Sequence, residues 1–170
     1  MMWFKLKVDS VADLHFRVRG YGSNKKGDDW CVIDLAVKSD VIDYGLYNDE
    51  SLEVSDVAEL EEALEKSLSG QNEDGIKIDP IEPYMMFEVF SKKVIHDIDY
   101  GAYMTWKVIL WGDDGAPSES TINLSLYRDD MEKLLTYLKY AKGEYTIDHL
   151  KVRELIEADY MYGDKRKVCI

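Results

Sequence analysis

Strand-like segments follow one another along this chain in runs, and this order restricts the fold more than any other feature. Residues 14–21 alternate apolar and polar side chains, the period-two pattern of a strand with one buried face. A largely apolar run follows at 30–37, and further strand patterns lie at 44–54, 84–90, 94–98, 103–111 and 120–126. Because a doubly wound parallel fold needs strands that alternate with helices, the order predicts an α+β fold. We expect an antiparallel, twisted β-sheet of about six to eight strands with two to three packed helices.

The first predicted helix covers residues 56–69. Either Ser55 or Asp56 can cap it, with Glu59 in the capping-box position three residues after Asp56, and Gly70 suits the left-handed residue that ends it. One apolar stripe is spaced for burial against a sheet: Val57, Leu60, Leu64 and Leu68. The opposite face carries Glu59, Glu61, Glu62 and Glu65.

Two further helices are expected towards the end of the chain. The second covers residues 129–141, and its inward side chains are Met131, Leu134, Leu135 and Leu138. Thr146 can cap a third helix from 147 to about residue 160. No repeat or linker divides the sequence, so residues 1–170 are predicted to form one domain, with 143–170 as a C-terminal extension.

Composition and cysteine content indicate a cytoplasmic protein. The first eight residues read as a strand and lack the basic-then-apolar order of a signal peptide. No stretch approaches the roughly 20 apolar residues that span a bilayer. The two cysteines, Cys31 and Cys169, are fewer than a small secreted scaffold normally carries, so Cys31 is expected to be a buried thiol.

The negative charge is concentrated in the middle of the sequence. The formal net charge is −13, and residues 28–99 contain 20 acidic and 5 basic residues. A field of this sign repels nucleic acids and anionic membranes, and it attracts a basic protein partner. We therefore expect no nucleic-acid partner and no membrane partner.

The sequence contains no motif that indicates catalysis, a cofactor or a metal site. The three histidines are isolated from one another, and metal-ligand, phosphate-loop and nucleophile-elbow spacings are all missing. One alternative remains open. The pairs Asp28-Asp29 and Asp113-Asp114 each follow a glycine, and if their loops met they would form a carboxylate-based metal or catalytic site. The same residues also suit ordinary tight turns.

Several short motifs occur in an order that resembles a known family. Gly27-Asp28-Asp29-Trp30 leads into a strand, an acidic helix ends at Gly70, and Glu82-Pro83 enters the segment Tyr84-Met85-Met86-Phe87-Glu88-Val89. This order, over roughly residues 14–142, resembles the WapI-type family of bacterial immunity proteins. The resemblance implies a small, non-enzymatic cytosolic protein that binds and neutralises a polymorphic contact-dependent toxin.

The charge distribution and the resemblance favour the same function, an immunity-type inhibitor of a basic toxin. The expected partner-binding residues are Asp49, Glu50, Glu53, Glu59, Glu61, Glu62 and Glu65. A third hypothesis is self-association through aromatic side chains, which often anchor interfaces. The aromatic residues that lie close together in sequence are Tyr44, Tyr47, Tyr100, Tyr103, Trp106 and Trp111.

Overall fold

Two larger antiparallel sheets, one two-stranded hairpin and three helices make up the described part of the chain, which in this computed structural model comprises residues 1–22, 29–71, 74–112 and 115–164. The five-stranded sheet has the order β11-β1-β2-β3-β4. Its strands are β1 (Trp3–Val8), β2 (Ala12–Arg19), β3 (Trp30–Lys38), β4 (Asp43–Glu53) and β11 (Met161–Tyr162). The four-stranded sheet has the order β10-β9-β6-β5. Its strands are β5 (Ile76–Ile78), β6 (Met85–Phe90), β9 (Tyr103–Trp111) and β10 (Pro117–Tyr127).

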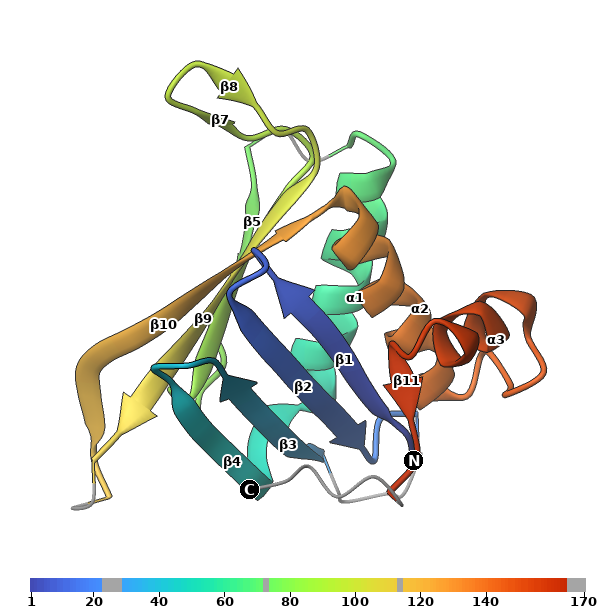
Figure 1. Ribbon diagram of the computed structural model, residues 1–170, viewed down its shortest axis with the longest axis horizontal. Coiled ribbons are helices and arrows are strands. Elements are labelled where there is room, and N and C mark those ends of the chain that lie inside the picture. The colour runs from blue at the N-terminus through green and yellow to red at the C-terminus, as the bar shows by residue number, and fades with distance from the viewer. Residues whose placement is uncertain (23–28, 72–73, 113–114, 165–170) are drawn as a thin grey trace.

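The three helices are α1 (Val54–Leu68), α2 (Arg128–Lys142) and α3 (Leu150–Glu157). Figure 1 shows α1 and α2 running behind the five-stranded sheet, while α3 projects from the side of the molecule. The predicted α+β class with twisted antiparallel sheets is confirmed. The strands divide between two larger sheets, however, where the sequence suggested a single one.

The two sheets meet through aromatic rings in the core. Trp106 of β9 is fully buried, and its ring lies edge-on to Phe16 of β2 at 4.9 Å and to Phe87 of β6 at 5.1 Å between centroids. Leu14, Phe16 and Val18 all point inward, as their alternation predicts. Trp106 therefore joins the inner faces of both sheets.

Helix α1 begins directly after β4, two residues earlier than predicted. Its N-cap is Glu53, whose main-chain N–H donates to the Asp56 carboxylate at 2.7 Å. The predicted cap at Ser55 or Asp56 is wrong because the strand runs into the helix without a loop. The apolar stripe is confirmed, since Val57, Leu60 and Leu64 are buried and Leu68 is half-buried.

The C-terminal part of the chain differs most from the prediction. The third helix starts after His149 rather than after Thr146, because residues 146–149 form a turn in which the His149 ring stacks on Tyr145 at 3.7 Å. It ends at Glu157, and the chain then adds β11 to the edge of β1, with Trp3 opposite Tyr162. The end of the described chain thus completes the sheet that its beginning starts.

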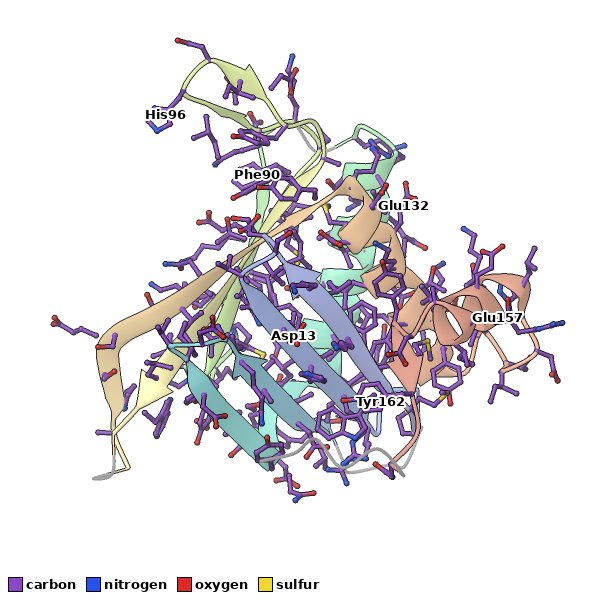
Figure 2. All side chains as sticks on the ribbon, in the orientation of Figure 1. Asp13, Phe90, His96, Glu132, Glu157 and Tyr162 are labelled. Atoms are coloured by element: carbon purple, nitrogen blue, oxygen red, sulfur yellow. The ribbon has the colours of Figure 1, made fainter. Side chains whose placement is uncertain are left out.

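The predicted strand at 94–98 is a hairpin. Strands β7 (Val94–Ile95) and β8 (Ile98–Asp99) are joined by His96 and Asp97, which have φ values of 50° and 64°. Two positive φ values give the backbone twist that a two-residue hairpin turn requires. Figure 2 shows His96 at the tip of this hairpin, away from the body of the protein.

Tyr137 of α2 connects the helix to β2 and to the residue before β1 through its hydroxyl group. The side chain is fully buried, its oxygen accepts the Val18 N–H at 3.0 Å, and its O–H donates to the Met2 carbonyl at 3.2 Å. Burial raises the pKa of the Tyr137 hydroxyl well above its usual range, so the hydroxyl stays protonated at neutral pH.

Tyr137→Phe is expected to lower the free energy of unfolding by about 1–3 kcal/mol, because it leaves the Val18 N–H and the Met2 carbonyl without this partner. Urea denaturation followed by circular dichroism measures the change. Tyr140→Phe is the control, since no hydrogen bond joins its hydroxyl to another described residue, and its effect should stay within about 0.5 kcal/mol. Equal effects for the two variants would show that the Tyr137 hydroxyl does not stabilise the fold.

Candidate functional site

Glu61 is the predicted contact residue whose position differs most from expectation. Its side chain is 5% exposed and lies between α1 and α2, not on the outer face of α1. Its carboxylate accepts the Tyr21 O–H at 2.5 Å and pairs with Lys142 Nζ at 3.2 Å. Burial and this hydrogen bond raise the pKa of Tyr21. The placement of Glu61 on the exposed face is therefore wrong, because its carboxylate is occupied by contacts within the protein.

Glu62 and Glu65 lie on the exposed face, but each has a lysine beside it. Glu62 Oε1 is 2.6 Å from Lys66 Nζ, one helical turn further on, and the hydrogen bond from Lys66 lowers the pKa of Glu62. Glu65 Oε1 is 2.5 Å from Lys139 Nζ of α2. The C-terminal half of α1 therefore presents much less net negative charge than its sequence indicates.

The remaining predicted carboxylates gather where β4 ends and α1 begins. Two acidic residues that were not predicted join them, namely Glu82 from the turn before β6 and Asp56 from the first turn of α1. We call this set the acidic edge, and it consists of Asp49, Glu50, Glu53, Asp56, Glu59 and Glu82. Within the described residues, no lysine, arginine or histidine forms an ion pair with any of them.

Carboxylates act on one another in the acidic edge. Burial raises the pKa of Asp49, and repulsion from Glu82 and Glu50 raises it further against a hydrogen bond from Tyr84. Burial likewise raises the pKa of Asp56. Folding therefore holds negative charges together at neutral pH without a cation to balance them, and this repulsion would be relieved by a positively charged partner.

Aromatic side chains lie next to the acidic edge. Tyr84, which hydrogen-bonds to Asp49, stacks on Trp111 with ring centroids 4.3 Å apart. The Trp111 Nε1–H points at the Pro83 carbonyl at 3.4 Å. Both rings are half-buried, so they are held in place while one face remains open. Half-buried Tyr and Trp beside charged groups are common at protein interfaces. Sequence reasoning missed this arrangement, although Glu82 and Tyr84 lie within the family-like segment.

The other aromatic residues that suggested self-association have separate positions. Trp106 and Tyr103 are buried, whereas Tyr47 and Tyr100 remain on the surface. Tyr100 contacts Tyr103 and Tyr127, with centroids about 6 Å apart, beside the β7–β8 hairpin. The rings therefore divide between the core and separate surface positions.

The alternative carboxylate site falls largely outside the described residues. Asp28, Asp113 and Asp114 belong to the parts of the chain that are not described, while Asp29 is exposed and its carbonyl accepts the Val54 N–H at 2.7 Å. Among residues 1–22, 29–71, 74–112 and 115–164, no group of three or more histidine, cysteine or acidic side chains is arranged to hold a metal ion.

Cys31 is buried as predicted, and burial raises the pKa of its thiol to about 12. It is therefore protonated at neutral pH and a poor nucleophile. Cys169 lies outside the described part of the chain, so whether a disulfide joins it to Cys31 is not tested. Of the described helices, none has the length and apolar character needed to cross a membrane.

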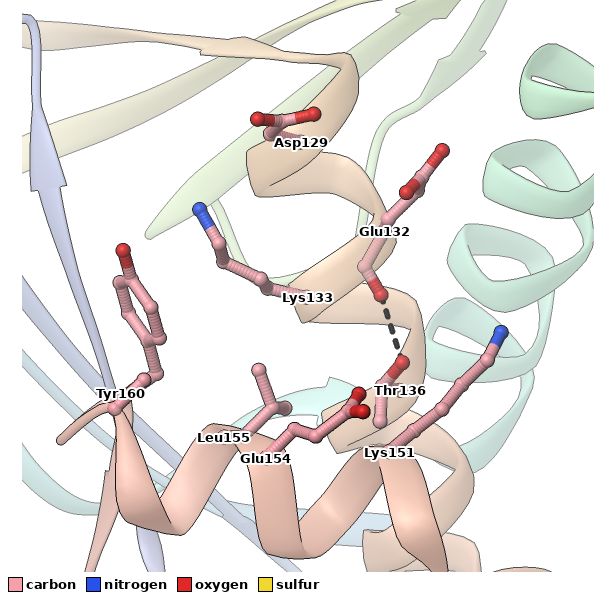
Figure 3. A pocket seen from close by; sticks show the side chains of 9 residues that line it. Asp129, Glu132, Lys133, Thr136, Lys151, Glu154, Leu155 and Tyr160 are labelled. Atoms are coloured by element: carbon pink, nitrogen blue, oxygen red, sulfur yellow. Dashed lines mark hydrogen bonds between the residues drawn. The ribbon is translucent and has the colours of Figure 1, made fainter.

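A hollow of about 320 Å³ lies between α2 and α3 (Figure 3). Its lining includes two lysines and three carboxylates, and the Lys133 ammonium lies 4.4 Å from the centre of the Tyr160 ring. The lining residues are Asp129, Glu132, Lys133, Thr136, Lys151, Glu154, Leu155, Ala158 and Tyr160. Its charges are mixed, and it lacks the single-signed field of the acidic edge.

Comparison with solved structures finds similarity to a protein described as WHY1 from Arabidopsis thaliana. The TM-score is 0.40 at 13% sequence identity, and the match covers 92% of each chain. A comparison with curated proteins gives no significant match. The sequence profile of the immunity protein WapI-like family matches residues 5–145, which include the acidic edge, Tyr84 and Trp111. The chain therefore belongs to the immunity protein WapI-like family.

Proposed function

We propose that this protein is a non-enzymatic, cytoplasmic immunity protein that binds a cognate basic toxin through the acidic edge and thereby neutralises it. The observation that carries the proposal is the set of carboxylates at the β4–α1 junction, which have no cation beside them among the described residues. Membership of an immunity-protein family supports a protein partner. Inhibition of this kind requires no catalytic group, only a surface that covers the toxin's own site.

The acidic edge suits such a partner for two physical reasons. A single-signed cluster steers an oppositely charged protein towards the correct face and raises the association rate by about 10- to 1,000-fold at low salt. Tyr84 and Trp111 then supply apolar contact area that is already held rigid by stacking, so little side-chain entropy is lost on binding. The carboxylates thus raise the rate at which the toxin associates, and the aromatic pair slows its dissociation.

The charge-reversed variant Glu50→Lys/Glu59→Lys/Glu82→Lys is expected to slow association with the toxin about tenfold or more at low salt, because steering is lost. These positions are chosen because Asp49, Glu53 and Asp56 also support the fold. The partner is first captured from host lysate with the wild-type protein at low salt and identified. Its purified toxin domain is then used for stopped-flow association and for a growth-rescue assay.

A matched control carries the same change in net charge elsewhere. Asp148→Lys/Glu154→Lys/Glu157→Lys alters exposed residues on and beside α3, and Figure 2 shows Glu157 on the opposite side of the molecule from β4. The control should retain wild-type association and rescue. Equal rates for both triple variants would place the binding surface elsewhere.

A further inference from the structure

Strand β10 is an edge strand with a side that no other described strand covers. Its residues 121–127 pair in regular register with β9, with Ile122 opposite Val108. The Ile109 N–H donates to the Tyr84 carbonyl, on the side of β9 that faces away from β10. Because main-chain groups of successive strand residues point to opposite sides, Val108 faces β10 and bonds with Ile122. The N–H and C=O groups of Thr121 and Asn123 therefore point towards the open side of β10.

The first part of β10 is protected against pairing with other chains. It begins with Pro117, it contains a register irregularity between Pro117 and Thr121, and the Ser120 N–H donates to the Ser118 hydroxyl at 3.1 Å. Proline, irregular register and local side-chain bonds are usual ways to block an edge. From Thr121 to Asn123 none of these three features is present, so the part of the edge that is open to pairing is limited to these residues.

An apolar groove of about 390 Å³ lies beside this open stretch. Ile122 and Leu124 of β10 line one side of it, and residues from the turns after β1 and β3 line the other. Figure 1 shows these turns next to β10. Val11 and Val41 in these turns are 71% and 90% exposed, which is unusual for such apolar side chains. The groove can therefore accept an apolar side chain from a strand placed next to β10.

Carboxylates surround this groove. Asp9 and Asp40 belong to its lining, and Glu119 is exposed on β10 just before it. Within the described residues, Asp40 and Glu119 form no ion pair with a lysine or arginine. The groove therefore favours a segment that carries basic residues beside its apolar one. A second copy of this chain is a poor occupant, because each copy has a formal net charge of −13.

We propose that β10 binds an extended basic and apolar segment of a partner protein as an added strand, with one apolar side chain in this groove. Main-chain bonds to Thr121 and Asn123 supply affinity, and the groove with its carboxylates supplies selectivity. The proposal does not depend on the acidic edge, which lies on β4, α1 and the turn before β6. The feature that β10 recognises is the extended basic and apolar segment itself, so the experiment uses a defined peptide.

The probe is the blocked, fluorescein-labelled peptide Lys-Val-Lys-Val-Thr-Val-Lys, titrated against the full-length protein by fluorescence anisotropy. Its control has glutamate in place of each lysine and should bind about tenfold more weakly or worse. Two N-methylated peptides are compared, one methylated at the odd-numbered nitrogens and one at the even-numbered nitrogens. Only one of these sets of N–H groups can face β10, so one peptide should lose binding and the other should retain it. A purely hydrophobic contact would not distinguish the two methylated peptides.

The decisive variant is Thr121→Pro, which removes an N–H from the open side and leaves the ladder to β9 intact. It should bind the peptide at least about tenfold more weakly with little change in melting temperature. The variant Glu50→Lys/Glu59→Lys/Glu82→Lys should still bind the peptide, which separates this proposal from the proposed function. Undetectable wild-type binding, or unchanged binding by Thr121→Pro, would overturn the proposal. Sedimentation that shows a dimer sensitive to Thr121→Pro would instead identify a second copy as the occupant.

Discussion

Trp106→Ala is expected to lower the free energy of unfolding by about 3–5 kcal/mol, which is a large part of the roughly 5–15 kcal/mol available to a domain. Trp106 is fully buried and contacts rings from both sheets, Phe16 and Phe87. Removing the indole opens a cavity at the junction that neither sheet can close alone, because each is held by its own ladder. Urea denaturation followed by far-ultraviolet circular dichroism measures the loss.

Two variants keep the Trp106 test interpretable. Trp111→Ala removes the same side chain from a half-buried surface position and should cost about 1–2 kcal/mol. Trp106→Phe retains most of the ring, and it also removes a buried N–H that has no hydrogen-bond partner among the described residues. It should therefore be much milder than Trp106→Ala. Equal losses for Trp106→Ala and Trp111→Ala would show that the ring contacts do not join the sheets.

Asp34→Ala is expected to lower the free energy of unfolding by about 3–5 kcal/mol through a different mechanism. Asp34 is 1% exposed, and its carboxylate accepts bonds from Arg17 Nε at 2.7 Å and Arg19 Nη2 at 3.0 Å. It also accepts the Asn48 main-chain N–H at 2.9 Å. Truncation leaves two guanidinium groups close together on the outer face of the five-stranded sheet without their shared anion. Thermal and urea unfolding measure the effect.

Replacing the whole cluster tests whether the loss comes from the two arginines that lose their shared carboxylate, although Arg17 also pairs with Asp164 and Arg19 also donates to Asn48. Asp34→Leu/Arg17→Met/Arg19→Met should recover most of the stability lost in Asp34→Ala, since apolar substitutes for a buried ion pair are often neutral. Asp13→Ala, which breaks the more exposed pair with Lys5 at 3.8 Å, should cost less than about 1 kcal/mol. A triple variant as unstable as Asp34→Ala would show that the loss does not come from arginines deprived of their carboxylate.

Local patterns could be read from the sequence because their causes are local. The alternation of Leu14, Phe16 and Val18 sets one face of β2, and the spacing of Val57, Leu60 and Leu64 sets one face of α1. Both predictions are confirmed. The division of the strands into two sheets depends on contacts such as that of Phe16 with Trp106, which are distant in sequence. No periodicity within a strand contains that information.

The sequence also does not show which acidic side chains of the candidate surface are exposed and which are buried. Glu61 and Glu62 are neighbours of the same type, yet one is buried against Tyr21 and the other is exposed, because only the packing of α1 on α2 distinguishes them. Glu82 acts on Asp49 although it comes from the turn between β5 and β6 in the other sheet. Sequence reasoning therefore located the acidic segment but could not separate its free carboxylates from its paired ones.

The pairing of β1 with β11 also constrains the order of events during synthesis. β1 leaves the ribosome well before its neighbour Met161–Tyr162, which follows more than 150 positions later. Until then the main-chain groups of Trp3 and Lys5 on that side have no strand beside them, including the Lys5 N–H that finally donates to Tyr160 at 2.7 Å. Contacts this distant in the chain slow folding. A nascent chain halted before α3 would therefore expose the unpaired edge of β1, where another chain could pair with it. The later addition of β11 covers that edge.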